Sequence, residues 1–388
     1  MSMSRIVVSL RGADRVRIGH PWIYRSDLKD IQAQGGDLVA VADPRGRVLA
    51  HALFSQKSQI ALRIVSRGDA PPPEGFIGQR IATAIAYRAS LGIDATAYRL
   101  VHGEGDLLPG LVVDRYGDYV VLQALSEGMD RRLDEIVTAL VAQLQPAGIL
   151  ARNDPRVREL EGLERRVDVL HGEVPERIQV SELGVRYEVD LRMGQKTGLF
   201  LDQRENREAA TRYARGRVLD AFSYNGGFAL NLAARAESVV ALDVSEDAVR
   251  HIRENAALNG RENIEARAVN VFDELREIEH SDDRFDLVVL DPPAFAKNRD
   301  ALRKALTGYK EINLRALKIL KPGGVLVTCT CSYHVDEAMF GDVVYRAALD
   351  AEVPVAVVEK RMQGRDHPVL LGVPETYYLK CFIVRRVG

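Results

Sequence analysis

The chain has 388 residues, of which 46% are hydrophobic and 28% charged, and its formal net charge is −2. This composition excludes a disordered chain, a collagen-like fibre and a disulfide-rich mini-protein. The near-zero charge argues against a protein that coats nucleic acid without specificity. Three cysteines favour a reducing, cytoplasmic compartment. No apolar stretch approaches the ~20 residues that span a bilayer, and residues 1–10 lack the features of a secretory signal, so no membrane is expected as a partner.

The charge is unevenly distributed along the chain. Residues 1–75 carry eleven basic and seven acidic side chains, a net charge of +4, which leaves −6 on the remainder. A basic module on an acidic body is typical of a nucleic-acid anchor, although a solvated charged surface gives the same count.

Short strand-like runs separated by turns occupy the first 70 residues and predict a small β-barrel or sandwich. The proline-rich stretch 70–75 that follows predicts a stiff, irregular linker and a domain boundary. The expected strands are Arg5–Leu10, Asp37–Val41, Val48–Phe54 and Gln59–Val65.

Residues 76–185 have the pattern of a middle α+β region. Apolar residues at helical spacing predict one helix over 76–90 and another over 127–144, where Pro146 ends the pattern. The turn 115–118 predicts a hairpin. The expected strands are Leu111–Asp114, Tyr119–Leu122, Gly148–Arg152 and Val185–Leu191.

From residue 186 to residue 388, apolar β-type runs alternate with helical stretches, which predicts an α/β fold with a parallel sheet covered on both faces. No full helix separates the last two strands, so these are expected to pair antiparallel at one edge. The expected strands are Val218–Phe222, Val239–Leu242, Ile264–Val269, Leu287–Leu290, Val325–Cys329, Val353–Val358 and Tyr378–Val384. The expected helices are Phe228–Arg235, Ala248–Leu258, Val271–Ile278 and Leu302–Leu320.

Ligands of such sheets bind beyond the carboxyl ends of the strands, where the strand order reverses. After the first strand, Gly226 and Gly227 would let backbone approach a ligand closely, although a plain helix-entry turn needs glycines as well. Neither the G-x-G-x-x-G fingerprint of dinucleotide-binding proteins nor the phosphate-binding G-x-x-x-x-G-K-[ST] loop occurs.

Two acidic residues follow the next two strands. Asp243 could accept hydrogen bonds from both ribose hydroxyls of a nucleoside, or it could cap a helix, a role that Ser245 fills as well. Asp273 could bind an adenine amino group or cap the helix that follows.

The sharpest local pattern, Asp291-Pro292-Pro293-Ala294-Phe295, follows the fourth strand. The two prolines end the strand and hold the carbonyls of Asp291 and Pro292 in an extended arc. Such an arc of acceptors suits a flat base with N–H groups, on which Phe295 could stack. A strand that merely ends at a proline needs neither the acid nor the aromatic ring.

Cys329 and Cys331 end the fifth strand and point the same way. They lack a third thiolate and histidines at the spacing of a zinc site, so no metal is expected. The pair could be small buried residues, or one of them could be a nucleophile, and Cys331 is then the better candidate because it lies nearer the strand end. The glycine turn, Asp243 and the Asp291 turn together favour S-adenosylmethionine as cofactor, because it is a nucleoside without phosphates.

The chain resembles a known family. Residues 190–388 are similar to class I S-adenosylmethionine-dependent methyltransferases, and nearly the full length resembles the ribosomal RNA large subunit methyltransferase I family, which methylates cytosine C5 in 23S ribosomal RNA. The stretches that carry the resemblance are His20-Pro21-Trp22, Leu107–Gly110, Asp114-Arg115, Lys196-Thr197-Gly198, Leu201–Arg204, Phe222–Tyr224, Gly226–Phe228, Asp291–Pro293, Gly308–Lys310, Ile312-Asn313, Cys331-Ser332, Asp366–Pro368 and Tyr378–Lys380.

The resemblance implies three domains. Residues 1–75 would form a PUA domain, an RNA-binding barrel, and residues 76–185 a middle α+β domain. Residues 186–388 would form the methyltransferase domain, a Rossmann-like sheet of seven strands with the last one antiparallel. The implied cofactor is S-adenosylmethionine and the implied partner is 23S ribosomal RNA, in the cytoplasm; a homodimer is compatible with the sequence.

The resemblance also implies roles for individual residues. Cys331 would add to cytosine C6, and Asp291 would hold or protonate N3 of that base. The cofactor would be bound by Gln203, Arg204, Asp220, Phe222, Ser223, Tyr224, Gly226, Gly227, Asp243, Asp273 and Asp291. The base would be contacted by Pro292, Pro293 and Phe295.

One departure keeps other functions open. Related enzymes of another branch carry a cysteine inside the fourth-strand motif, whereas this motif reads Asp-Pro-Pro-Ala-Phe and also resembles that of amino-group methyltransferases. An RNA methyltransferase acting on an exocyclic amino group such as guanine N2, which needs no Cys331, is therefore an alternative. An RNA-binding assembly factor with an inert fold and a small-molecule methyltransferase are the others.

Overall fold

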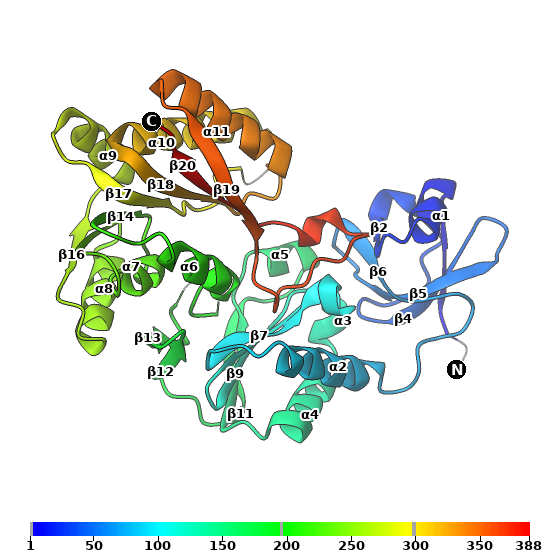
Figure 1. Ribbon diagram of the computed structural model, residues 1–388. Helices are drawn as coiled ribbons and strands as arrows, with labels where there is room; N and C mark the ends of the chain where they lie inside the picture. Colours follow the sequence, from blue (N-terminus) through cyan, green and yellow to red (C-terminus); the bar gives the residue numbers. More distant parts are fainter. Residues whose placement is uncertain (1–2, 195–196, 297–299) are drawn as a thin grey trace. The chain divides into compact units, whose positions relative to one another are not determined.

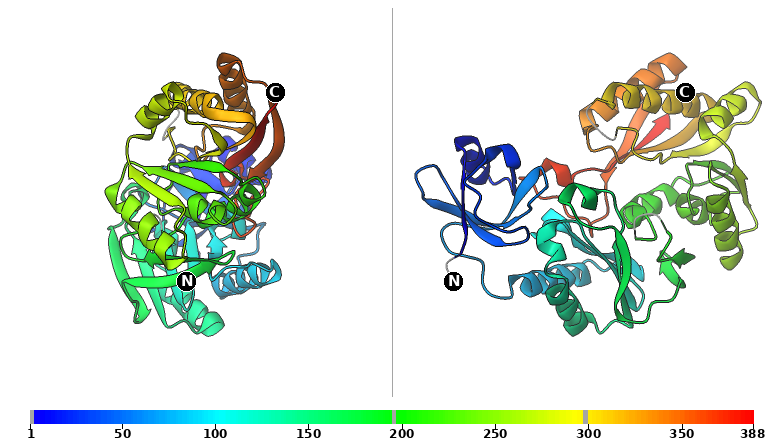
Figure 2. Two further views of the ribbon diagram at one scale, coloured as in Figure 1. Left: turned by 60° about the vertical axis from the view of Figure 1, so that its left-hand side comes forward. Right: turned by 180° about the vertical axis from the view of Figure 1, so that it is seen from behind.

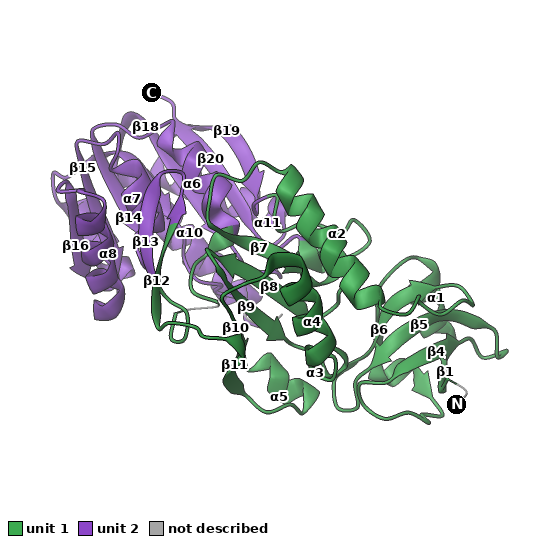
Figure 3. Cartoon of the chain, turned by 90° about the horizontal axis from the view of Figure 1, so that it is seen from below, with its two compact units in different colours: residues 1–180, 189–201, 365–376 green, residues 181–188, 202–364, 377–388 purple. Residues whose placement is uncertain are grey.

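The computed structural model describes residues 3–194, 197–296 and 300–388 (Figure 1). The chain divides into two compact units (Figure 3). Unit 1 comprises residues 1–180, 189–201 and 365–376, and unit 2 comprises residues 181–188, 202–364 and 377–388. The chain therefore passes repeatedly between the units, and the three-domain division expected from the sequence stays a prediction.

The first part of unit 1 is a six-stranded sheet in the order β2-β6-β5-β4-β1-β3, around a core that includes Ile6, Val39 and Leu62. The expected strand over 5–10 is shorter than predicted, because Ser9 Oγ accepts a hydrogen bond from the Gly12 amide and begins a helix that the sequence analysis missed. The elements are β1 (Arg5–Val8), α1 (Leu10–Arg17), β2 (Trp22–Tyr24), β3 (Leu28–Lys29), β4 (Leu38–Ala42), β5 (Val48–Phe54) and β6 (Ile60–Arg67).

The second part of unit 1 is a five-stranded sheet in the order β11-β10-β9-β8-β7, against which α2 and α4 pack. The hairpin predicted around residues 115–118 is confirmed as β8 and β9. The single helix predicted over 127–144 is wrong: it breaks at Arg132, which has φ −112°. The elements are α2 (Phe76–Ser90), β7 (Ala97–His102), β8 (Leu111–Tyr116), β9 (Tyr119–Ala124), α3 (Glu127–Asp130), α4 (Leu133–Leu144), β10 (Gly148–Asn153), α5 (Val157–Glu161) and β11 (Arg166–Gly172). The next two strands along the chain, β12 (Arg177–Glu182) and β13 (Val185–Asp190), form a separate two-stranded sheet.

Unit 2 is built on a seven-stranded sheet in the order β16-β15-β14-β17-β18-β20-β19. Figure 2 shows the chain in two further views. The first five strands in this order are parallel, and β20 runs antiparallel to both of its neighbours, as predicted for the last strand. The strands are β14 (Arg217–Ala221), β15 (Ser238–Asp243), β16 (Ile264–Ala268), β17 (Phe285–Leu290), β18 (Leu320–Thr330), β19 (Val355–Met362) and β20 (Lys380–Arg386).

Helices cover both faces of this sheet, because its strands are apolar on both sides. Apolar residues of α9, α10 and α11 pack on one face, and those of α6, α7 and α8 pack on the other (Figure 1). The helices are α6 (Arg204–Thr211), α7 (Gly227–Leu232), α8 (Glu246–Leu258), α9 (Val271–His280), α10 (Leu302–Ile319) and α11 (Glu337–Ala351). The strand order reverses between β14 and β17, so a ligand site is expected beyond the carboxyl ends of these two strands.

Candidate active site

The loop after β14 is held in an unusual conformation. Phe222 and Tyr224 both have positive φ angles, of 65° and 51°, which are costly for residues with side chains. Asp220 Oδ2 compensates by accepting hydrogen bonds from Ser223 Oγ at 2.6 Å and from the Ala229 amide at 2.9 Å. Strained loops of this kind are concentrated at functional sites, which supports the site predicted here.

Asp243, at the end of β15, holds the same loop from the other side. Its Oδ2 accepts a hydrogen bond from the Tyr224 amide at 2.9 Å, and its Oδ1 accepts one from the Ser245 amide at 3.0 Å. The alternative of Asp243 as a helix cap is wrong, because Ser245 caps α8 through the Ala248 amide. Asp243 therefore lies at the predicted ligand site.

Asp273 lies apart from this cluster. It is exposed on α9, where its Oδ1 pairs with Arg276 Nη1 at 3.1 Å. The alternative cap role is again wrong, because Asn270 caps α9 through the Phe272 amide. Binding of adenine by Asp273 stays a prediction.

Three carboxyl groups meet at the switch point. The Asp291 amide donates to the Ala221 carbonyl at 3.4 Å, which brings the turn after β17 beside the end of β14. Burial, together with the charges of Asp291 and Asp243, raises the pKa of Asp220 to about 7, although the bonds from Ser223 and Ala229 oppose this rise. Asp220 Oδ1 is buried and has no hydrogen-bond partner among the residues that the structure describes. A buried carboxyl with a spare oxygen, next to two other acids, fits a positively charged ligand.

Gln203 and Arg204, expected at the cofactor from the resemblance, begin α6. Gln203 Nε2 donates to Asp291 Oδ1 at 2.8 Å. Asn206 Nδ2 in turn donates to Gln203 Oε1 at 2.6 Å, which orients the amide. Arg204 is buried, with Nη2 3.9 Å from Glu205 Oε1. The structure thus brings Gln203 into the acidic cluster.

The Asp291–Pro293 turn leaves β17 with Pro292 buried and Pro293 exposed. Phe295 is half-buried in an aromatic cluster, with ring centroids 4.6 Å from Tyr309 and 5.9 Å from Phe272. These contacts fix the ring from within the protein, and its stacking on a base stays a prediction.

The three cysteines differ in their surroundings. Cys329 and Cys381 are fully buried and are Cα partners on β18 and β20. Burial raises the pKa of the Cys329 thiol well above its ordinary value. Cys331 is half-buried just past the end of β18, and its Sγ donates to the Pro292 carbonyl at 4.0 Å. The candidate nucleophile therefore lies against the proline turn.

The sequence analysis assigned no role to three buried residues at this end of the sheet. Tyr309 of α10 and Ser332 share a hydrogen bond of 2.8 Å between their hydroxyl oxygens. Lys380, at the start of β20, is 2% exposed, and its Nζ donates to the carbonyls of Tyr377 at 3.3 Å and Tyr378 at 3.4 Å. Burial lowers the pKa of Lys380, and the electrostatic effects of Asp336, Cys331 and Glu337 oppose this shift. The only sequence signal for these residues was their membership in stretches that carry the resemblance.

Other stretches of the resemblance lie in unit 1. Thr197 Oγ1 donates to Asp114 Oδ2 at 2.6 Å, and Arg99 binds the same carboxylate through two nitrogens at 2.8 and 2.9 Å. Asp366 Oδ2 accepts a bond from the Arg99 amide at 3.0 Å. Lys196 lies outside the described residues. This buried network ties Thr197 and Asp366 to Asp114 and Arg99 within unit 1.

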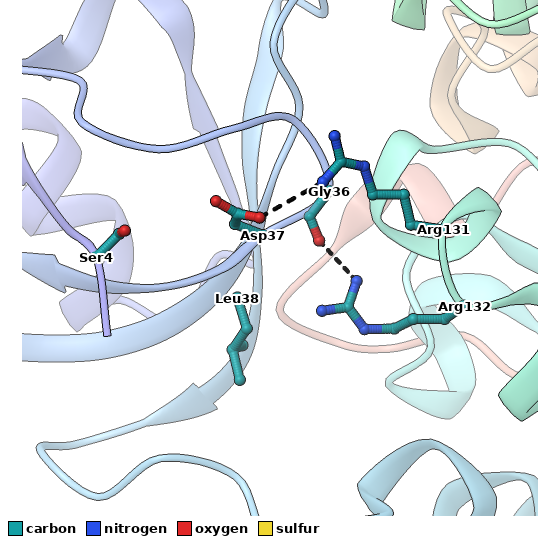
Figure 4. A pocket seen from close by; sticks show the side chains of 6 residues that line it. All are labelled: Ser4, Gly36, Asp37, Leu38, Arg131 and Arg132. Atoms are coloured by element: carbon teal, nitrogen blue, oxygen red, sulfur yellow. Dashed lines mark hydrogen bonds and ion pairs between the residues drawn. The ribbon is translucent and has the colours of Figure 1, made fainter. Parts of the chain in front are cut away.

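A pocket of about 410 Å³ also lies in unit 1 (Figure 4). Its arginines are already engaged: Arg131 Nη1 lies 3.5 Å from Asp37 Oδ1, and Arg132 Nη1 donates to the Gly36 carbonyl at 2.7 Å. The pocket therefore lies between the six-stranded sheet and the segment that joins α3 to α4. Its lining residues are Ser4, Gly36, Asp37, Leu38, Arg131 and Arg132.

Two classes of site are not found within the described ranges. No group of three or more His, Cys, Asp or Glu side chains there is placed to hold a metal ion. No helix in the same ranges has both the length and the apolar character that crossing a membrane requires.

Comparison with known proteins identifies the class. Residues 6–67 match the PUA-like domain, and residues 98–370 match the S-adenosylmethionine-dependent methyltransferase family. The fold is therefore that of an S-adenosylmethionine-dependent methyltransferase. The chain is 40% identical over 379 residues to ribosomal RNA large subunit methyltransferase I of Tolumonas auensis, covering 95% of this chain and 96% of that protein. The protein of the same name from Vibrio cholerae is 39% identical over 394 residues, covering 98% and 99%. This chain belongs to the ribosomal RNA large subunit methyltransferase I family, as predicted.

A solved structure agrees on the fold. SMU.776, determined in complex with SAH, superposes with a TM-score of 0.85 at 21% identity, covering 99% of this chain and 100% of that chain. At this identity the likeness shows a shared fold. It confirms the predicted architecture of a Rossmann-like methyltransferase sheet.

Proposed function

We propose that this protein methylates cytosine C5 in 23S ribosomal RNA, with Cys331 as the nucleophile and S-adenosylmethionine as the methyl donor. The names of the relatives support a ribosomal RNA of the large subunit as substrate. The observation that carries the cytosine assignment is the position of Cys331: it is the one cysteine of the three that is not fully buried, and its Sγ lies against the Pro292 carbonyl.

The residues of the acidic cluster suit the cofactor. S-adenosylmethionine, when bound, supplies a methyl group activated by a positive sulfonium. Asp220 Oδ1 offers a free acceptor to its cationic part, and Asp243 has further acceptor capacity for ribose hydroxyls. The strained Phe222–Tyr224 loop and Gly226 would present backbone to the rest of the nucleoside. The Gln203 amide keeps Asp291 oriented at the same site.

Cytosine C5 is a poor nucleophile and needs activation. Cys331 Sγ would form a bond to C6, and Asp291 would hold or protonate N3, so that electron density moves to C5. C5 then takes the methyl group, a base removes the C5 proton, and the electron pair of that C–H bond re-forms the C5–C6 double bond as the Cys331 sulfur leaves. The Pro292 carbonyl and the exposed Pro293 would contact the base, and Phe295 would support the turn from behind.

The PUA-like part would bind RNA through phosphate contacts. Arg45 and Arg47 are exposed in the turn between β4 and β5, where the Asp43 carboxylate binds their backbone amides at 3.0 Å each. Replacing both with Gln should weaken RNA binding and reduce the slope of log K against log salt by about 1 to 2, because each lost phosphate contact removes one released counterion. Filter binding over a salt series measures this slope.

The main experiment compares two cysteine variants. Cys331→Ala should abolish 5-methylcytosine in 23S ribosomal RNA, and Cys329→Ala, a matched substitution two residues away in the core, should retain it at permissive temperature. Nucleoside mass spectrometry of RNA from cells lacking the gene and complemented with each variant gives the answer. Full 5-methylcytosine with Cys331→Ala would reject the mechanism.

A covalent trap tests the same step directly. RNA with 5-fluorocytosine at the target has no C5 proton to remove, so the Sγ–C6 bond should persist after methyl transfer. The wild-type protein should then migrate with RNA on a denaturing gel, and Cys331→Ala should not.

An exocyclic amino group is the second candidate target, because the stretch Asp-Pro-Pro-Ala-Phe also resembles the motif of amino-group methyltransferases. Methylated guanine in the RNA, together with an active Cys331→Ala variant, would favour this target over cytosine C5.

A further inference from the structure

Two buried hydroxyl groups lie directly behind the candidate nucleophile. Tyr309 of α10 and Ser332, the residue after Cys331, are both 0% exposed. Their hydroxyl oxygens are 2.8 Å apart. The amide of Ser332 also donates to Thr330 Oγ1 at 3.2 Å, so a hydrogen bond links the two neighbours of Cys331.

The same two hydroxyls reach the loop that carries the proline turn. The Ala296 amide donates to Ser332 Oγ at 3.3 Å, and the Phe295 amide donates to the Tyr309 hydroxyl at 3.5 Å. Residues 291–296 directly follow strand β17, and residues 331–332 directly follow strand β18. The hydroxyl pair therefore joins the loop of Asp291 to the loop of Cys331.

Packing fixes the Tyr309 ring as well as its hydroxyl. The ring lies between Phe295, with centroids 4.6 Å apart, and Phe340, at 5.9 Å. The next helical turn adds a bond, because Asn313 Nδ2 donates to the Tyr309 carbonyl at 2.7 Å. A Cβ at Gly308 would come within 3.3 Å of Phe295 Cδ2, so the glycine lets this ring approach α10. Burial raises the pKa of Tyr309, so its hydroxyl stays protonated and can donate one bond while accepting another.

We propose that Tyr309 is a positioning residue for methyl transfer: with Ser332, its hydroxyl sets the distance between Cys331 Sγ and the Asp291–Pro293 turn. This inference rests on the proposed role of Cys331. In the proposed reaction Cys331 Sγ bonds to C6 of the base while Asp291 contacts N3. Because C6 and N3 belong to the same ring, the relative position of the two loops decides whether both contacts can form at once. Tyr309 and Ser332 are too buried to touch the base themselves.

The test removes the hydroxyl and keeps the ring. Tyr309→Phe should lower kcat for RNA methylation about 10- to 100-fold, as expected for a loss of geometry at the reacting atoms, with KM for S-adenosylmethionine within about twofold of wild type. The rate of covalent adduct formation with 5-fluorocytosine RNA should fall by the same factor. Tyr213→Phe is the matched control, because the Tyr213 hydroxyl also makes one side-chain hydrogen bond, to Glu359 Oε1 at 2.7 Å, and has no part in the site. This control should leave kcat unchanged.

A double-variant cycle separates positioning from general destabilisation. Ser332→Ala should lower kcat to the same extent as Tyr309→Phe. Because the two hydroxyls act as one pair, kcat of the double variant should lie within about twofold of the slower single variant. The inference would be overturned if the reductions in kcat of the two single variants multiplied in the double variant. It would also be overturned if kcat of Tyr309→Phe were within twofold of wild type. A wild-type protein that forms no adduct and no 5-methylcytosine would instead overturn the proposed function, so the two failures are distinguishable.

Discussion

Gln203 Nε2 donates a 2.8 Å hydrogen bond to Asp291 Oδ1, which joins the start of α6 to the turn after β17. Because Asn206 Nδ2 occupies Gln203 Oε1 at 2.6 Å, the amide nitrogen is the atom that faces Asp291. Gln203 therefore fixes the orientation of the Asp291 carboxyl group beside two other acids.

Removing this donor should weaken catalysis. We expect Gln203→Leu to lower kcat/KM for RNA methylation about 10- to 100-fold, because a hydrogen bond to a charged group is worth about 1.5–3 kcal/mol. Gln79→Leu, which changes an exposed glutamine of α2, is the control. Steady-state kinetics measures both variants. Equal activity of the two would show that the Gln203–Asp291 bond has no catalytic role.

The thiols should react with alkylating agents in a fixed order. Cys331 is half-buried at the strand end, whereas Cys329 and Cys381 are buried in the core and the pKa of Cys329 is raised by burial. Iodoacetamide needs an accessible thiolate, so at pH 8 Cys331 should be modified first and the other two only on unfolding. Peptide mass spectrometry over a time course measures this. Modification of Cys329 before Cys331 in the native protein would contradict the assignment of Cys331 as nucleophile.

The sheet of unit 2 was predictable because its strands are continuous apolar runs between helical stretches. The break at Arg132 was not, because Leu133, Ile136 and Leu140 continue the apolar spacing expected of one helix. At the break, Arg132 Nη1 donates to the carbonyl of Gly36, a contact far along the chain that helical spacing does not reveal. Helix α1 was missed because Ser9, which caps it, directly follows an apolar stretch with the pattern of a β-strand.

The candidate site was predictable where its residues lie at or just beyond the carboxyl ends of strands, as with Asp220, Asp243, Asp291 and Cys331. The contacts that complete it were not, because they join residues far apart in the sequence: Gln203 and Asp291 are 88 positions apart, and Tyr309 and Ser332 are 23 apart. A periodicity in one segment carries no information on which distant side chain will bond to it.

Binding of S-adenosylmethionine should depend on the ionisation of Asp220. Its pKa of about 7 exceeds the ordinary 3.8, so the unliganded protein loses stability from this group as pH rises from 3.8 to about 7. A cationic ligand favours the ionised form, so affinity should rise with pH up to about 7 and then level off, with a proton released on binding below that pH. Calorimetry at pH 6.5 in buffers of different ionisation enthalpy measures the released proton.

The matched variant is Asp220→Asn, which can still accept bonds from Ser223 and Ala229 but has no proton to lose. It should bind more weakly at pH 8 and show no proton release at pH 6.5. Proton release of wild-type size in this variant would assign the titration to another group, with Asp243 and Asp291 as the neighbouring acids.

A buried ion pair joins the six-stranded sheet of unit 1 to helix α5. Arg63 Nη2 lies 2.8 Å from Glu161 Oε1, and Ser55 Oγ donates to Glu161 Oε2 at 2.6 Å. Both charged side chains are buried, at 8% and 1% exposure. Burial alone would raise the pKa of Glu161, but the charge of Arg63 and the bonds from Ser55, Ser58 and Arg63 hold it below the ordinary 4.5.

The stability of unit 1 should therefore depend on this pair in a pH-dependent way. Because the folded pKa of Glu161 is depressed, its contribution is present above pH 4.5 and is lost as pH falls through the folded pKa. Glu161→Gln leaves Arg63 buried without its counter-charge and should lower the free energy of unfolding by about 3 kcal/mol at pH 7. This loss of stability should shrink toward pH 3, where the wild-type carboxyl is protonated as well.

The control is Glu159→Gln on the same helix. Because its partner Arg165 is exposed, this substitution should lower the free energy of unfolding by less than about 1 kcal/mol. Urea unfolding at both pH values measures these differences, and equal losses from the two substitutions at pH 7 would show that the Arg63–Glu161 pair does not hold the sheet to α5.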